Sequence, residues 1–271
     1  RSALLTRVIV AVVLAVLAVV VTVLLGFGGA DASRLTLGGD VTAYGVLQAA
    51  GLMFFAFAGY ARIATLGEEV TDPEKTIPRA IPIALGITLV VYALVAVAVL
   101  AELGATGLAG SQAPLSDAVR TAGFSALEPV VGVAAAIGAL GALLALLLGV
   151  SRTTLAMARD RHLPHVLAAV HPRHRTPHRA ELAVGAAVAV LAAVVDLGSA
   201  IGFSSFGVLL YYAIANASAL TLGRRVLPAL GLVGCLTLAA TLPLTSVLAG
   251  AIVVAVGMIS YSAGARRRHG V

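Results

Sequence analysis

A glycine in the middle of an apolar run is the residue best placed to bind a solute. Gly59 stands in the sequence Phe-Phe-Ala-Phe-Ala-Gly-Tyr-Ala, inside a run long enough to cross a bilayer. Glycine weakens a helix by about 1 kcal/mol relative to alanine. A helix that breaks inside a membrane frees N–H and C=O groups, which are tolerated only where they line a cavity or bind a ligand. The competing interpretation is a close-packing glycine in a continuous helix.

Arg62 follows three residues later and lies well inside the same apolar run. Ionisable side chains are costly inside a bilayer and are functional candidates there. Glu68 and Glu69 follow the run, and either could pair with Arg62 across a turned backbone, so we take these three residues as a hypothetical inner gate. The alternative is that Arg62 extends its side chain to the inner headgroups.

The composition places these residues in a membrane. Of the 271 residues, 60% are hydrophobic and only 11% are charged, whereas soluble domains have about 25% charged residues. The apolar residues form runs of the length that crosses a hydrocarbon core of about 30 Å. We therefore predict an all-α polytopic membrane protein with a single transmembrane domain over residues 1–271 and two sizeable outer loops, around 29–43 and 103–128. The predicted spans are 4–28, 43–66, 79–101, 126–150, 182–197, 200–222, 226–242 and 247–264.

Basic residues test this division into spans. With eight spans, 15 of the 18 lysines and arginines fall on one side, Arg34 and Arg120 fall on the other, and Arg62 is within a span. The side rich in basic residues is expected to be cytoplasmic. Both ends of the chain are therefore predicted to be cytoplasmic, in a protein of the cytoplasmic (plasma) membrane. The net charge of +6 is then a signal of orientation and not of nucleic-acid binding.

Local patterns predict how some spans begin and pack. Asp72 before Pro73 predicts an N-cap followed by proline at the first helical position, and Pro78 is predicted to open the third span in the same manner. Small residues in the fourth span predict tight helix packing. Its glycines are Gly132, Gly138, Gly141 and Gly149.

The remaining polar residues argue against an enzyme and against a metal site. Five histidines fall between the fourth and fifth spans, but prolines and arginines interrupt them and no carboxylate or cysteine cluster completes a site. We predict a solvated basic loop, with no metal and no cofactor. No hydrolase, phosphate-binding or zinc-protease motif occurs, and no acid–base pair is visible. The histidines are His162, His165, His171, His174 and His178.

Two stretches of the chain resemble the amino acid–polyamine–organocation (APC) permease superfamily. Residues 54–81, Phe-Phe-Ala-Phe-Ala-Gly-Tyr-Ala-Arg-Ile-Ala-Thr-Leu-Gly-Glu-Glu-Val-Thr-Asp-Pro-Glu-Lys-Thr-Ile-Pro-Arg-Ala-Ile, are similar to the family's sixth helix and the loop after it. Residues 151–164, Ser-Arg-Thr-Thr-Leu-Ala-Met-Ala-Arg-Asp-Arg-His-Leu-Pro, resemble the end of its eighth helix. The resemblance extends more weakly over the whole chain, as helices five to twelve.

The resemblance implies a LeuT-like inverted-repeat fold, here without its first four helices. It also implies a substrate site between the broken first and sixth helices, of which this chain holds the sixth. Phe55 and Phe57 would flank the break, with Phe55 as an aromatic gate. Ala58, Gly59 and Tyr60 would form the break. Ala61 stands where some relatives carry an acidic residue, which argues against a polycation-specific exchanger.

The predicted function is secondary active transport of amino acids or related amines by alternating access, possible with a coupled proton or cation. The partners expected are a small-molecule substrate and the lipid bilayer. The alternative is a non-transporting membrane scaffold or sensor of the same fold. The sequence does not indicate which substrate, which coupling ion or which oligomeric state applies.

Overall fold

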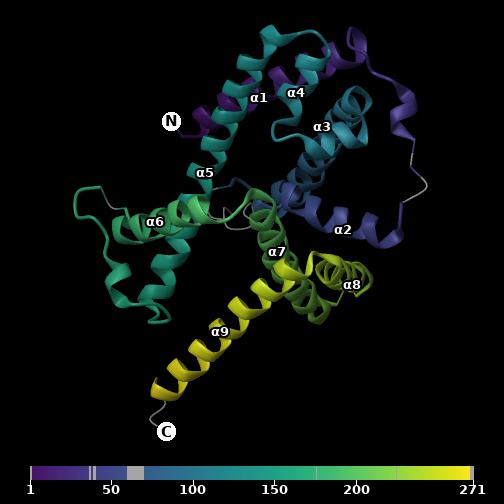
Figure 1. Ribbon diagram of the computed structural model, residues 1–271. Coiled ribbons are helices and arrows are strands. Elements are labelled where there is room, and N and C mark those ends of the chain that lie inside the picture. Colours follow the sequence, from purple (N-terminus) through teal and green to yellow (C-terminus); the bar gives the residue numbers. More distant parts are fainter. Residues whose placement is uncertain are drawn as a thin grey trace. The chain divides into compact units, whose positions relative to one another are not determined.

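The computed structural model describes residues 2–36, 38, 41–59, 70–174, 176–223 and 225–268. Every regular element in this described part is helical (Figure 1), which confirms the predicted all-α class. Two shorter apolar segments are Ala43–Phe57 and Val226–Thr241. Five segments are long and apolar enough to cross a membrane: Leu4–Gly26, Pro73–Gly110, Ser125–Arg159, Leu197–Leu222 and Leu244–Ser262.

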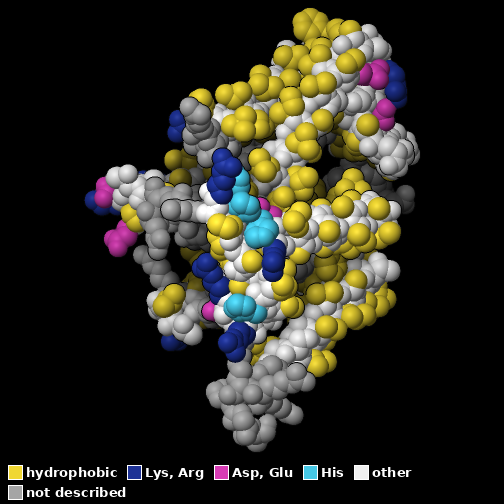
Figure 2. Space-filling model, turned by 90° about the vertical axis from the view of Figure 1, so that its left-hand side faces the viewer, with side chains coloured by type: hydrophobic (Ala, Val, Ile, Leu, Met, Phe, Trp, Pro, Cys, Tyr) yellow, Lys and Arg dark blue, Asp and Glu magenta, His cyan; other side chains and the backbone are white. Residues whose placement is uncertain are grey.

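Hydrophobic side chains cover most of the surface seen in Figure 2. Leu140, Val133 and Ile252 are 65%, 59% and 62% exposed. A monomeric soluble protein rarely shows large contiguous apolar patches, whereas lipid tails solvate such side chains. The exposed surface therefore agrees with a polytopic membrane protein.

The helices gather into two compact units, which we describe one at a time. The first consists of Arg1–Gly39 and Asp72–Gly149. It contains α1 (Ser2–Gly26), the 3-10 turn η1 (Ala32–Leu35), α3 (Pro73–Gly110), α4 (Pro114–Thr121), the 3-10 turn η4 (Ser125–Leu127) and α5 (Glu128–Arg159) as far as Gly149.

Small and branched side chains build the core of this unit. The cluster joins α1, α3, α4 and the start of α5, and its central members are fully buried. Where α1 meets α5, a Cβ placed on Gly141 would lie 3.3 Å from Ile9, and one on Gly138 would lie 3.4 Å from Val13. The predicted packing role is thus confirmed for these two glycines, while Gly132 has no neighbour within 4 Å of such a Cβ.

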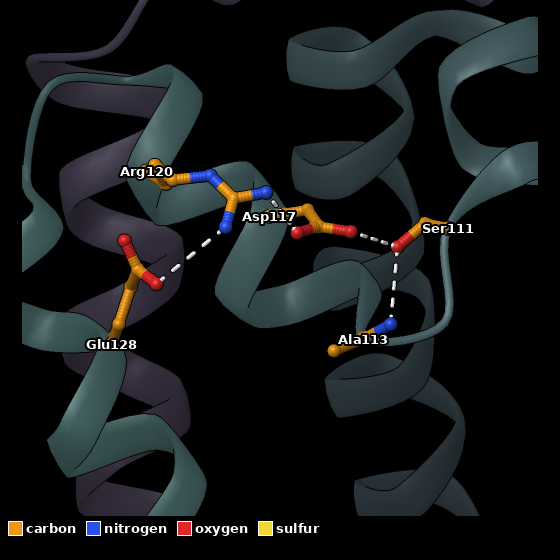
Figure 3. A network of polar contacts seen from close by, with 5 residues as sticks. All are labelled: Ser111, Ala113, Asp117, Arg120 and Glu128. Carbon is orange, nitrogen blue, oxygen red and sulfur yellow. Dashed lines mark hydrogen bonds and ion pairs between the residues drawn. The ribbon is translucent and has the colours of Figure 1, made fainter.

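Part of the predicted outer loop 103–128 is a folded helix. α4 buries Ala118 and Val119 in the core, and polar groups at its ends bind one another (Figure 3). Asp117 accepts from the Ser111 hydroxyl and from Arg120, whose guanidinium also lies 3.7 Å from the Glu128 carboxylate. The segment between α3 and α5 is therefore held in a defined conformation.

The start of α3 differs from the prediction. Asp72 does occupy the N-cap position before Pro73, but its backbone is left-handed (φ 49°) and its side chain makes no capping bond. Its main-chain carbonyl accepts from the amides of Lys75 and Thr76 instead. Pro78 does not open a helix, because α3 already runs through it and through Pro82. The prediction for Pro78 was wrong.

The second unit consists of Asp40–Thr71 and Val150–Val271. Its core centres on Leu209, Tyr212 and Ala213 of one helix, together with Cys235 and Leu242. Figure 1 shows α8 beside α7 within this unit. The elements are α2 (Ala43–Met53), η2 (Phe54–Phe57), the end of α5, η5 (His165–Ala168), α6 (His178–Val194), α7 (Leu197–Ala219), η6 (Leu220–Leu222), α8 (Val226–Thr241) and α9 (Leu244–Arg268).

Gly250 is expected to be the least replaceable glycine of α9. A Cβ added there would run into the ring of Phe206 on α7, and overpacking of this kind typically costs about 1–3 kcal/mol. Gly250→Ala should therefore lower the thermal unfolding midpoint of the purified full-length protein. Gly257→Ala, on the same helix, meets nothing within 4 Å and should leave the midpoint unchanged or raise it. Equal midpoints for the two variants would contradict the described contact of α9 with α7.

Candidate functional site

The predicted break near Gly59 coincides with the end of an α-helix. α2 begins after Thr42, whose hydroxyl accepts from the Gly45 amide at 3.0 Å, and it ends at Met53. One 3-10 turn, η2, follows, and the amide of Ala58 closes it by donating to the carbonyl of Phe55 at 3.0 Å. α-Helical geometry thus stops inside the apolar run, well before its predicted end at residue 66.

Gly59 has a φ of 123°, a conformation that side-chain-bearing residues rarely adopt. Ala58 before it is extended, with φ −66° and ψ 138°. Nothing lies within 4 Å of a Cβ placed on Gly59, so the backbone conformation, and not a lack of space, requires glycine here. Main-chain N–H and C=O groups at such a turn are no longer committed to a regular helical ladder.

Polar side chains of α7 and the α8 backbone hold the last turns of α2. The hydroxyl of Ser205 on α7 donates to the carbonyl of Leu52 at 3.3 Å, and the amide of Gln48 donates to the carbonyl of Thr241 at 3.1 Å. Gly51 allows close approach, because a Cβ there would lie 3.1 Å from the Leu238 carbonyl oxygen. The end of α2 is therefore positioned by two neighbouring helices.

An aromatic pair lies at the same place. Phe54 of η2 packs edge-to-face on Tyr212 of α7, with ring centroids 5.7 Å apart, and Tyr212 is only 6% exposed. Phe55 is 41% exposed, and Phe57 is half-buried. Phe54 therefore anchors the turn, which leaves Phe55 free to face a solute or lipid.

Sequence reasoning named some of these residues and missed others. Of the predicted substrate-binding residues, Phe55, Phe57, Ala58 and Gly59 come together in one turn because they are consecutive in the chain. The missed residues are polar or aromatic side chains within apolar runs, and that feature was the available signal. They are Gln48, Phe54, Ser205 and Tyr212. The other predicted residues lie outside the described part of the chain: Tyr60, Ala61, Arg62, Glu68 and Glu69.

Ser205→Ala is expected to weaken the attachment of α2 to α7. Ser205 is fully buried, and the substitution leaves the Leu52 carbonyl without its hydroxyl donor. A loss of about 0.5–1.5 kcal/mol in unfolding free energy is typical for such a bond, and a lower unfolding midpoint would report it. Ser204→Ala, one residue away on α7, provides the control and should change the midpoint less. The reverse order would show that the bond to Leu52 contributes nothing.

An apolar hollow of about 150 Å³ lies elsewhere, in the first unit. It is bounded by α1, η4 and the start of α5, and every residue lining it is an alanine, valine or leucine. Ligand sites for polar solutes place a few hydrogen-bonding groups within an apolar wall. This hollow has none in its lining and suits hydrocarbon, not a zwitterion. Its lining residues are Ala15, Val16, Val19, Val20, Leu127, Val130 and Val131.

The histidines between α5 and α6 form a small cluster. The rings of His174 and His178 lie 4.8 Å and 5.4 Å from that of His171. The Nδ1 atom of His171 accepts from the backbone amides of Arg173 and His174. Within the described ranges, no three His, Cys, Asp or Glu side chains are arranged to hold a metal ion.

Comparison with known proteins places the chain in a family. Residues 2–266 match the amino acid permease family. An uncharacterized transporter of Mycobacterium tuberculosis is 67% identical over 273 residues, which cover 98% of this chain and 62% of that protein. The branched-chain amino acid permease BcaP of Bacillus subtilis is 26% identical over 80% of this chain and 50% of its own length.

A further relative is the methylthioribose transporter of Bacillus subtilis, which is 31% identical over 67% of this chain and 39% of its own length. The chain therefore spans less than two thirds of the length of each of these relatives. Its family match covers nearly all of the 271 residues, and its helices include five of membrane-crossing length. The chain belongs to the amino acid permease family of the APC superfamily and is a multi-pass membrane protein.

Proposed function

We propose that this chain forms part of a secondary active transporter that moves amino acids or related amines across the cytoplasmic membrane by alternating access. The observation that carries the proposal is the end of α2 at Met53 followed by the left-handed Gly59, inside an apolar run. Family membership supports transport as the activity, since related proteins are named as transporters.

The chemistry of the break suits a zwitterion. Free N–H groups at a helix end attract a carboxylate, and free carbonyls accept from an ammonium group. Phe55 and Phe57 would cover the aliphatic part of the substrate, and Tyr60 and Ala61 would continue the binding surface. Because Ala61 carries no charge, the proposed substrate is a neutral amino acid or a small amine and not a polycation. Any coupled proton or cation would bind at another position.

The inner gate remains part of the proposal. Arg62 would pair with Glu68 or Glu69 when the inner side is closed and release the pair when it opens. Both ends of the chain would be cytoplasmic, as the distribution of basic residues indicates. The bundle would rock around the site at the break.

Uptake of radiolabelled amino acids by the full-length protein in liposomes tests this function. We expect saturable uptake of at least one neutral amino acid, above that of empty liposomes and dependent on an ion gradient. A panel with and without pH and sodium gradients would identify substrate and coupling together. If the folded protein in liposomes moves and binds none of the amino acids or amines, it is a scaffold or sensor instead.

A further inference from the structure

Glu102 is a buried acid on α3 that the proposed transport site does not use. It is only 2% exposed, and its Oε2 atom has no hydrogen-bond partner. Glutamate is almost never fully buried unless it is paired, and an isolated buried carboxylate is strongly unfavourable. A group of this kind requires a physical explanation.

A carbonyl oxygen faces the same small space. A Cβ built on Gly28 would lie 2.8 Å from Glu102 Oε2 and also 2.8 Å from the main-chain oxygen of Leu24. The Gly28 amide, which would continue the helical ladder by bonding to Leu24, bonds to the Val23 carbonyl at 2.9 Å. Two acceptor oxygens therefore flank the side-chain-free face of Gly28.

The nearest cation is already committed to other atoms. Arg34 of η1 donates through one Nη1 atom to the carbonyls of Ala101, at 3.2 Å, and of Glu102. The Asp31 amide also donates to the Ala101 carbonyl, at 3.0 Å. These bonds satisfy main-chain oxygens next to the bend of α3 at Gly104, where φ is 69°, and leave the Glu102 carboxylate without a donor at Oε2.

The other charged groups on the surrounding elements have their own partners. On η1, Asp31 accepts from the Ser33 amide at 2.8 Å. On α4, Asp117 and Arg120 bind each other, and Arg120 also reaches Glu128. The last turn of α1 carries no ionisable side chain. Within the described chain, Arg34 is thus the charged side chain with bonds to the main chain at Glu102.

We infer that Glu102 Oε2 and the Leu24 carbonyl oxygen together bind one small monovalent cation, either Na⁺ or a proton. Such a cation removes the repulsion between two facing acceptors. Sodium does so by accepting both oxygens as ligands, and a proton does so by turning the carboxylate into an O–H donor toward the carbonyl. The site lies at the predicted outer end of α3 and is separate from the break at Gly59. The inference does not depend on the proposed transport activity.

Thermal unfolding of the purified full-length protein tests the inference, with choline chloride replacing sodium chloride at constant ionic strength and at neutral and mildly acidic pH. The wild type is expected to gain several degrees in unfolding midpoint when the cation is supplied. A response to sodium identifies Na⁺, and a response to acid alone identifies a proton. Glu102→Gln should lose that response while keeping a high midpoint, because its amide can donate to the Leu24 carbonyl. Glu128→Gln, another acid of the same unit, should respond as the wild type does.

The inference fails if the wild type responds to neither cation, or if Glu102→Gln responds as strongly as the wild type. It also fails if Glu102→Gln and Arg34→Gln lower the midpoint equally and the double variant lowers it no further. That pattern would identify an internal pair between Arg34 and Glu102. Because each readout is a midpoint, a protein that does not transport amino acids could still give the expected result.

Discussion

Gly59→Ala is expected to reduce uptake by the full-length protein about tenfold or more. The residue has a φ of 123°, and holding a side-chain-bearing residue in such a region costs of the order of 1–3 kcal/mol. The chain would relieve this strain by changing the turn after η2. Since the proposed site consists of main-chain groups in that turn, a small change in backbone direction would misplace them.

The control for this prediction is Gly86→Ala on α3. Gly86 lies within a helix and has nothing within 4 Å of an added Cβ, so alanine should be tolerated and should favour the helix slightly. Both variants are compared with the wild type at matched amounts of protein in the liposome membrane. Undiminished uptake by Gly59→Ala would show that the left-handed turn is not needed for transport.

Leu209→Ala is expected to cause the largest loss of stability, about 2–5 kcal/mol. Leu209 is fully buried and packs in the core of the second unit with Tyr212, Ala213 and Cys235. Removing its side chain leaves a cavity among residues that also support the end of α2. The unfolding midpoint of the purified protein should fall well below that of the wild type.

Ile214→Ala, on the same helix, provides a matched comparison. Ile214 is 60% exposed and is predicted to face lipid, so its truncation leaves no protein cavity. We expect a much smaller change in midpoint. If Ile214→Ala were the more destabilising variant, α7 would present a different face to the core from the one described.

Periodic and compositional features were predictable from the sequence because they are local. Apolar runs predicted the all-α class, and the small residues Gly138 and Gly141 predicted close helix contact. Gly59 was identified because a glycine in a long apolar run weakens the helix there. Its left-handed conformation, and the end of α2 already at Met53, needed coordinates.

Features that depend on distant parts of the chain were not predictable. Ser205 and Leu52 are 153 residues apart, and Gln48 and Thr241 are 193 residues apart. A single sequence does not indicate which serine in an apolar helix meets which carbonyl. The burial of Glu102 was hidden for the same reason, because α1 and η1 surround it. Pro78 was misjudged since proline is favoured in the first turn, yet α3 starts five residues earlier.

Cysteine labelling at the break tests the central claim most directly. Ala58→Cys, in a full-length protein whose other cysteines are replaced, should react with a water-soluble thiol reagent, and a transported amino acid should slow that reaction. Ile252→Cys, at an exposed apolar position of α9, should show no such protection. We predict substrate protection at residue 58. Labelling there at the same rate with and without a substrate that the protein demonstrably transports would contradict the placement of the site.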